Sequence, residues 1–235
     1  MNLTPTPQQR DVNDAFFNSE HTKIGVTSGI GCGTTTAAIA IAIANMVEKE
    51  RSTILVCKVP KAYRYKCAWM LMVSEAKASS EQLVCSGSRI YVKGKKDTFV
   101  EVIYADGFTE EYAVEIAKSG SVDVILDGLS PFLFRQDELI TVLDTLAPYK
   151  TMFFDKAISM NYGYSPELPN CFAVSYGLIQ NHGFHNIKLS SFDSPLCTSK
   201  CLALQKPDLW GETHEQMQAR LRGEFLIEEE PECQQ

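Results

Sequence analysis

The segment that most restricts how this chain can fold is a glycine-rich turn between a short apolar strand and a long apolar helix. Lys23 to Thr27 (KIGVT) has the pattern of a strand, and Ser28 to Gly33 (SGIGCG) has the composition of a tight turn. The Thr34 to Lys49 segment that follows is an apolar helix with charge only at its end. A strand that passes through such a turn into a buried helix is the first half of a βαβ unit. The segment therefore predicts an α/β fold.

The rest of the chain continues the alternation of strands and helices. Thr53 to Val59 (TILVCKV) has the continuous hydrophobicity of a buried parallel strand, and Val122 to Leu126 (VDVIL) repeats it. The pattern also predicts helices at 8–18, 61–78, 110–119, 136–147 and 213–221, and strands at 82–84, 89–92, 98–104, 151–154 and 171–175. The three short strands at 82–104 are expected to form an antiparallel excursion.

These elements together predict one P-loop-like domain at residues 1–227, followed by an acidic flexible tail at 228–235. The expected architecture is a doubly wound, mostly parallel sheet with helices on both faces. The longest apolar stretch, Thr36 to Met46, is too short to cross a bilayer, and Met1 to Arg10 is too polar for a signal peptide. We therefore expect a cytoplasmic protein without membrane contact, whose eight cysteines are reduced.

The charge of the chain restricts how it could contact nucleic acid. The formal net charge is −7 and the pI is about 5.2, so the molecule as a whole does not attract DNA. Any contact must therefore be local. Two basic patches are candidates, at Lys58 to Lys66 (KVPKAYRYK) and Lys93 to Lys96 (KGKK), where tyrosines nearby could stack on bases. The alternative is an ordinary solvated face.

The spacing of the glycine-rich turn matches a phosphate-binding P-loop, GxxxxGK[ST]. In such a loop backbone N–H groups surround the phosphates, the lysine reaches the terminal phosphates, and the hydroxyl binds magnesium. The aligned residues are Ser28 at the first position, Gly29 and Gly31 within the loop, Gly33 at the second glycine, Thr34 at the lysine position and Thr35 at the hydroxyl position. No lysine or arginine occurs between Ile24 and Val47, so no shifted charge within the loop replaces the lysine.

Two other interpretations of this turn remain open. The glycines can simply permit a tight connection between strand and helix. Alternatively, Gly29-Ile30-Gly31 followed by Thr34 resembles the dinucleotide fingerprint GxGxxG with its last glycine replaced, which would indicate a Rossmann-type protein. No acidic residue closes the strand at 53–59, where the partner of the ribose would belong.

A second motif, VDVILDG, delivers a carboxylate at the end of a buried strand. P-loop proteins hold magnesium with a carboxylate in this place, and Asp127 occupies it here. The next residue is Gly128, where many such ATPases have the glutamate that polarises the attacking water. The alternative is that Asp127 caps a helix or a turn.

The order and separation of these motifs resemble the ATPase domain of the large subunit of tailed-bacteriophage terminases, the DNA-packaging motor. The segments that carry the resemblance are LTPTPQQ at 3–9, similar to the family's glutamine motif, the loop at 28–35, SGSRI at 86–90, VDVILDGLS at 122–130, SSFDSP at 190–195 and RLRGEF at 220–225. Thr34 and Gly128 depart from the family, which has lysine and glutamate at these positions.

The resemblance implies a set of site residues. Gln8 or Gln9 would contact adenine, the backbone of residues 29–35 would hold the phosphates of ATP, and Thr35 and Asp127 would hold Mg²⁺. Asp127 would be the catalytic carboxylate. Without the lysine and the glutamate, we expect weak or absent ATP hydrolysis.

The resemblance also implies a setting and partners. They are ATP, double-stranded DNA through the basic patches, and portal or other packaging subunits, in the host cytoplasm. The leading prediction is therefore a terminase-like ATPase domain that acts in viral DNA packaging. The alternatives are a non-catalytic interaction module that retains the P-loop fold and a Rossmann-type dinucleotide-binding protein.

One further cluster could bind a metal. His182, His185, Cys197 and Cys201 form an HxxH…CxxxC pattern whose residue types suit a tetrahedral zinc site. The pattern also suits two thiols buried by a helix. Gly, Pro or Ser lies within two positions of each of these residues, which is typical of separate surface turns. We expect no zinc at these residues.

Overall fold

The computed structural model describes residues 5–58, 83–119, 122–129, 132, 135–147, 149–156, 171–203 and 213–224. The elements of these residues are, in chain order, α1 (Pro7–Asn18), β1 (Lys23–Ser28), α2 (Thr34–Glu48), β2 (Ser52–Cys57), β3 (Leu83–Ser86), β4 (Arg89–Val92), β5 (Phe99–Tyr104), η2 (Ala105–Gly107), α4 (Glu110–Ser119), β6 (Val122–Asp127), α5 (Gln136–Thr145), β7 (Thr151–Lys156), α6 (Cys171–Asn181), β8 (His185–Leu189), α7 (Ser199–Ala203) and α8 (His214–Arg222).

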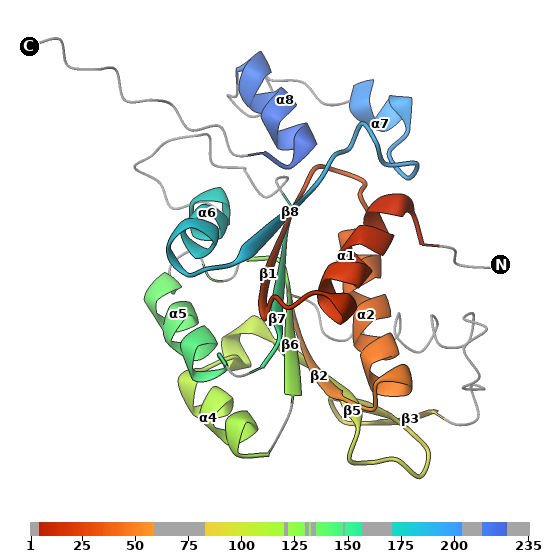
Figure 1. The fold of residues 1–235 in the computed structure, drawn as a ribbon, viewed down its shortest axis with the longest axis vertical. Helices are drawn as coiled ribbons and strands as arrows, with labels where there is room; N and C mark the ends of the chain where they lie inside the picture. The colour runs from red at the N-terminus through yellow and green to blue at the C-terminus, as the bar shows by residue number, and fades with distance from the viewer. Residues whose placement is uncertain are drawn as a thin grey trace, which may run out of the picture.

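The strands form one eight-stranded sheet in the order β3-β4-β5-β2-β6-β7-β1-β8. The strands from β5 to β8 in this order pair in parallel, and β4 pairs antiparallel with both β3 and β5. Helices α1 and α2 cover one face of the sheet, and α4, α5 and α6 cover the other (Figure 1). The predicted doubly wound, mostly parallel α/β fold is confirmed.

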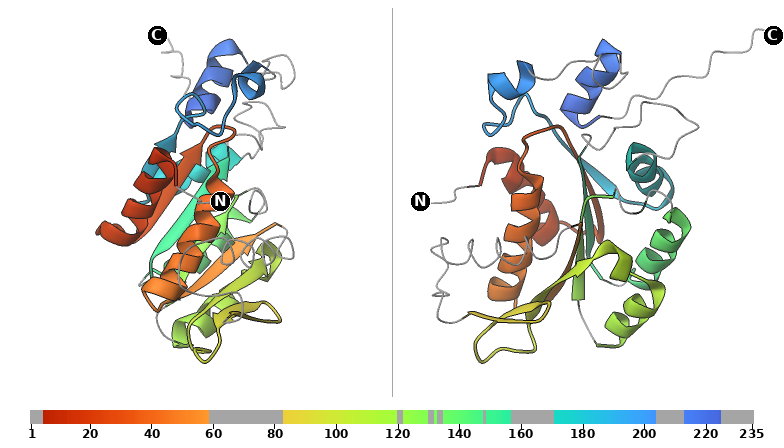
Figure 2. Two further views of the ribbon diagram at one scale, coloured as in Figure 1. Left: turned by 90° about the vertical axis from the view of Figure 1, so that its right-hand side faces the viewer. Right: turned by 180° about the vertical axis from the view of Figure 1, so that it is seen from behind.

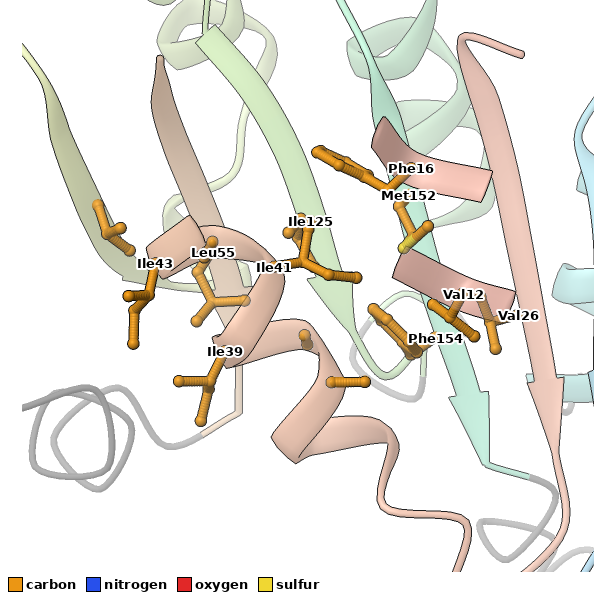
Figure 3. Packing of buried hydrophobic residues seen from close by; sticks show 14 of the residues in the cluster. Val12, Phe16, Val26, Ile39, Ile41, Ile43, Leu55, Ile125, Met152 and Phe154 are labelled. Atoms are coloured by element: carbon orange, nitrogen blue, oxygen red, sulfur yellow. The ribbon is translucent and has the colours of Figure 1, made fainter. Parts of the chain in front are cut away.

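The alternation of side chains along the strands divides the core into two layers. Leu55, Ile125 and Phe154 pack toward α1 and α2, where the apolar α2 is buried along most of its length (Figure 3). Val124 and Phe153 occupy the intervening strand positions and pack toward the other three helices. Because successive strand residues face opposite sides, this parity also fixes the face on which each residue at a strand end lies.

The last helices lie beyond one end of the sheet. Both views in Figure 2 show α7 and α8 at the end of the molecule toward which β1 and β8 run. In parallel strands that end is the carboxyl edge, where ligands of α/β proteins usually bind. The helix α8 follows a capping box at Thr213 and ends at Gly223, whose φ is +68°.

The structure corrects one predicted element and adds another. The predicted strand at Cys171–Ser175 is wrong, because these residues begin the helix α6. Val174 and Leu178, four residues apart, are both buried, which is helical periodicity that the short apolar run alone does not reveal. The parallel edge strand β8 was not predicted. The predicted helix at 61–78 and the tail at 228–235 lie outside the described residues.

Within the described part of the chain, no helix combines the length and the apolar character needed to cross a bilayer.

Candidate functional site

The turn between β1 and α2 has a backbone conformation that requires glycine. Gly31 has φ +75° and Gly33 has φ +72°, in the left-handed region that residues with a Cβ rarely adopt. Gly33 is the N-cap of α2 and supplies no side-chain cap. The first N–H groups of α2 therefore lie at an uncapped helix N-terminus, the positive end of the helix dipole.

Asp127 lies at the same edge of the sheet as this loop. β6 and β1 are separated by one strand, β7, and all three run parallel. The register aligns Asp127 with Phe154 of β7, which in turn aligns with Val26 of β1. Asp127 has the same parity as Ile125, so it lies on the face of the sheet that α2 covers. The loop and the predicted magnesium carboxylate thus share one edge and one face.

The strand between them brings two charged residues that sequence reasoning missed. Asp155 is buried, accepts a hydrogen bond from the Ser175 hydroxyl of α6, and accepts another through its backbone carbonyl from Ser28 Oγ at 3.2 Å. The backbone of Lys156 pairs with that of Ser28, the first loop residue. The signal was present in the sequence, since β7 (TMFFDK) has a carboxylate, Asp155, directly after its buried apolar run, much as β6 has Asp127.

The loop is held from outside by segments that are distant in sequence. Ser191 Oγ donates to Ile30 O and Ser194 Oγ donates to Gly31 O, each at 2.8 Å. Gln9 Nε2 donates to Gly33 O at 3.2 Å. Three carbonyls of the loop therefore point toward a support made of α1 and the 190–197 segment, which we call the loop support.

The direction of these carbonyls fixes the direction of the following amides. In a trans peptide the C=O of one residue and the N–H of the next point to opposite sides. The described backbone contains no cis peptide bond. The N–H groups of Gly31, Cys32 and Thr34 therefore point away from the loop support. The amides of Gly31 and Cys32 are successive, and successive amides that point to one side are the basis of anion-binding concavities. The N–H of Gly29 is excluded from it, because it donates to Leu189 O at 2.9 Å.

The close approach of the loop support explains the glycine at position 29. A Cβ atom on Gly29 would lie 2.2 Å from both Ser191 Oγ and Leu221 O. Leu221 lies in the last turn of α8, and its carbonyl also accepts a hydrogen bond from Ser191 N at 2.7 Å. The C-terminal helix therefore packs directly against the junction of β1 and the loop.

The two glutamines of the predicted adenine contact have different roles. Gln9 Oε1 accepts from Thr6 N at 3.0 Å in the capping box of α1, while its Nε2 donates to Gly33. Gln9 thus uses one end of its amide for the cap of α1 and the other for the loop. Gln8 Nε2 donates to Ser190 O at 3.0 Å, and its enclosed Oε1 has no hydrogen-bond partner among the described residues. Of the two, Gln8 retains the unused acceptor.

The two positions that depart from the terminase motifs differ in their surroundings. Thr34 is buried at the first residue of α2, beside the partly exposed Thr35. Gly128 has φ +103° and donates its N–H to Phe154 O at 2.9 Å. This backbone is strained for any residue with a Cβ, so a glutamate could not occupy position 128 in the conformation seen here.

The residues of the possible zinc site lie at opposite ends of β8. His185 begins the strand and stacks on His21 with the ring centroids 4.0 Å apart. Cys197 follows the other end and contacts Gly31 of the loop. In the residues that the structure describes, no group of three or more histidine, cysteine or acidic side chains is arranged to hold a metal ion.

Comparison with known proteins identifies the fold. No protein-family model matches the sequence, and neither does any curated protein. Two solved structures of the large terminase ATPase domain of Thermus phage P74-26 are similar at 14% sequence identity. One, a mutant, gives a TM-score of 0.55 with 95% of each chain covered. The other gives 0.53, with 95% of this chain and 100% of that chain covered. The chain therefore has a fold similar to that of a phage large terminase ATPase domain.

Proposed function

We propose that the chain is a terminase-like domain that binds ATP with Mg²⁺ at residues 28–35, hydrolyses it slowly or not at all, and acts in viral DNA packaging. The observation that carries the proposal is the orientation of the loop backbone. The loop support takes three carbonyls, and the N–H groups of Gly31, Cys32 and Thr34 face the other side at the N-terminus of α2. This arrangement suits a polyphosphate. The fold and the order of the sequence motifs support the same assignment.

The residues near the loop fit magnesium. Mg²⁺ prefers hard oxygen ligands and is usually held by one or two protein groups together with phosphate and water. Thr35 offers a hydroxyl at the start of α2, and Asp127 offers a carboxylate on the same face of the sheet. When bound, the ion would neutralise phosphate charge. The role of the two residues is to hold it between the loop and β6.

Gln8 is the better of the two candidates for the base contact. Its Oε1 can accept a hydrogen bond, whereas both ends of the Gln9 amide are already used. An acceptor at this position favours adenine, which presents an exocyclic amine, over guanine, which presents a carbonyl at the equivalent carbon. A buried acceptor without a partner costs about 1–3 kcal/mol, so a partner for it would add to nucleotide affinity.

Slow turnover follows from Thr34 and Gly128. A threonine cannot supply the positive charge that stabilises a transferring phosphoryl group, and a glycine cannot orient or polarise water. Loss of one pre-organised electrostatic group in an active site typically costs about 10²–10³ in kcat. In such a domain, conformational change would follow from ATP binding more than from ATP hydrolysis.

The proposal is tested by calorimetric titration of the purified chain with ATP in the presence and absence of Mg²⁺. We expect Mg²⁺-dependent binding that Thr35→Val and Asp127→Asn each weaken about tenfold, because each removes one oxygen ligand. A phosphate-release assay on the same samples should give a kcat far below the usual ~1–10³ s⁻¹ of enzymes. Binding that neither variant changes would reject the site, and a kcat in the usual range would reject the impaired chemistry.

For DNA, the described part of the chain offers the hairpin between β4 and β5. Lys95 pairs with Glu50 at the base of this turn, which leaves Lys93 and Lys96 of the predicted patch as candidates for phosphate contacts. Of the other patch, only Lys58 lies within the described residues. The double variant Lys93→Gln/Lys96→Gln should weaken binding to double-stranded DNA. It should also reduce the slope of log K against log[salt] by about two, one for each lost phosphate contact. Lys118→Gln on α4 is the matched surface control. If it weakens DNA binding as much as the double variant does, the hairpin is not the DNA contact.

A further inference from the structure

Two cysteines, one in the loop and one in the loop support, lie near the same serine hydroxyl. Cys32, within the loop, is buried and donates its thiol to Leu189 O at 3.4 Å. Cys197, in the loop support, lies against Gly31: a Cβ atom on Gly31 would be 3.0 Å from Cys197 Cβ and 3.3 Å from its Sγ. The Ser191 hydroxyl lies within hydrogen-bonding reach of both thiols. Any movement of Cys197 therefore acts directly on the loop.

A third cysteine lies one helical turn further along. Thr198 begins the turn that leads into α7, where its Oγ1 accepts from Cys201 N at 3.2 Å and lies 3.3 Å from Cys201 Sγ. Cys201 N bonds to Thr198 Oγ1 and Leu202 N bonds to Thr198 O, so Thr198 caps α7, with Cys197 just before the cap and Cys201 in the first turn of the helix. Both cysteines are partly exposed, in contrast to Cys32. The CxxxC pair is thus accessible from solvent and in contact with the loop.

The environments of the three thiols differ in a way that assigns them roles. The hydrogen bond from Thr198 lowers the pKa of Cys201, and the nearby Lys200 adds to the effect. Burial raises the pKa of Cys197, and a Cys201 thiolate beside it raises it further. Burial and Cys197 raise the pKa of Cys32 to about 11. Because the thiolate is the nucleophile, Cys201 is the attacking group and Cys32 is inert.

We propose that Cys197 and Cys201 form a reversible disulfide that changes the conformation of the loop at residues 28–35. The oxidant is a small-molecule disulfide such as oxidised glutathione. The Cys201 thiolate attacks one sulfur of glutathione disulfide and displaces one glutathione thiolate, which leaves a mixed disulfide. Cys197 then loses its proton to solvent and attacks the Cys201 sulfur, which releases the second glutathione. In sum, two protein thiols lose two electrons and two protons, and glutathione disulfide becomes two molecules of glutathione.

The expected effect on the loop follows from the contacts of Cys197. Its backbone N–H donates to Ser194 O at 3.0 Å, and the Ser194 hydroxyl in turn holds Gly31 O. Drawing Cys197 toward Cys201 therefore disturbs both the thiol that packs on Gly31 and the serine that orients its carbonyl. The loop should open, and Cys32 beneath it should become more accessible. A consequence for ATP affinity rests on the proposed function, but the disulfide and the opening of the loop do not.

The experiment equilibrates the full chain in mixtures of reduced and oxidised glutathione, followed by acid quenching, alkylation and peptide mass mapping. Trypsin cleaves after Lys200 and separates the two cysteines, so the disulfide appears as a crosslink between two peptides. We expect this crosslink in the wild type and in Cys85→Ser, which removes an exposed cysteine on β3, and its loss in Cys201→Ser. Absence of the crosslink under oxidising conditions, or a stable glutathione adduct in its place, would overturn the proposal.

A second readout tests the effect on the loop without any nucleotide. The rate at which iodoacetamide labels Cys32 should rise at least threefold in the oxidised protein, and dithiothreitol should restore the slow rate. Equal labelling rates in the two states would overturn the switch even if the disulfide forms. Mg²⁺-dependent ATP affinity should fall at least threefold on oxidation. If neither state binds ATP, the proposed function fails, whereas crosslinking and labelling still decide the inference about the cysteines.

Discussion

At the scale of single residues, the site depends as much on backbone conformation as on side chains. Gly128 has φ +103°, so the turn after β6 requires glycine, and any single substitution that adds a side chain there would strain the backbone. Gln9 connects a helix cap to the loop, and Ser191 connects the loop to α8. The identity of the loop residues was readable from sequence, but these partners were not.

The strain at Gly128 can be measured by substitution. Gly128→Ala should destabilise the fold by about 1–3 kcal/mol although a Cβ there would meet nothing within 4 Å, because the cost lies in the backbone. The matched control is Gly177→Ala in α6, where a Cβ also meets no neighbour and φ is not positive. There the change should stabilise by about 0.5–1 kcal/mol. The free energy of unfolding of both variants is measured by urea denaturation. Equal changes in the two variants would refute the argument from backbone strain.

The stacked pair His21 and His185 gives the stability a pH dependence. Burial, and secondarily the charge of His21, lower the pKa of His185 in the folded protein. The unfolded chain therefore binds a proton more readily than the folded one near the ordinary histidine pKa of about 6.5. Stability should rise as the pH increases from about 5 to 7 and then level off. Urea midpoints across this range should show a shallower rise in His185→Gln than in the wild type. An unchanged slope would contradict the account.

At the scale of elements, strongly patterned segments were predictable and short ambiguous ones were not. The strands β1, β2, β6 and β7 and helices α2 and α4 follow the predicted pattern closely, because continuous apolar runs and glycine turns define them. The helix α6 begins with apolar and β-branched residues that also suit a strand, and β8 contains a histidine, an asparagine and a lysine. Tertiary packing determined both: α6 packs on a face of the sheet, and β8 pairs with β1 at its edge.

At the scale of the whole molecule, the first and last described helices, α1 and α8, both reach the loop. The bond between Ser191 and Ile30 joins residues 161 positions apart, and α1 and α8 both contact the region of β1 (Figure 1). Contacts of such separation leave no local pattern in the sequence, which is why the loop support was not predicted. They also mean that a ligand in the loop should stabilise the entire fold.

The most direct test of the central claim is therefore the melting temperature of the full chain with Mg²⁺ and ATP. A ligand that binds only the folded state at ten times its Kd stabilises by about 1.4 kcal/mol. For a chain of this size that corresponds to a rise of roughly 3–6 °C. We predict such a rise with ATP and Mg²⁺, a smaller one in Thr35→Val, and none with NAD. No shift with millimolar ATP, or a shift with NAD alone, would contradict the assignment of residues 28–35 as an ATP-binding loop.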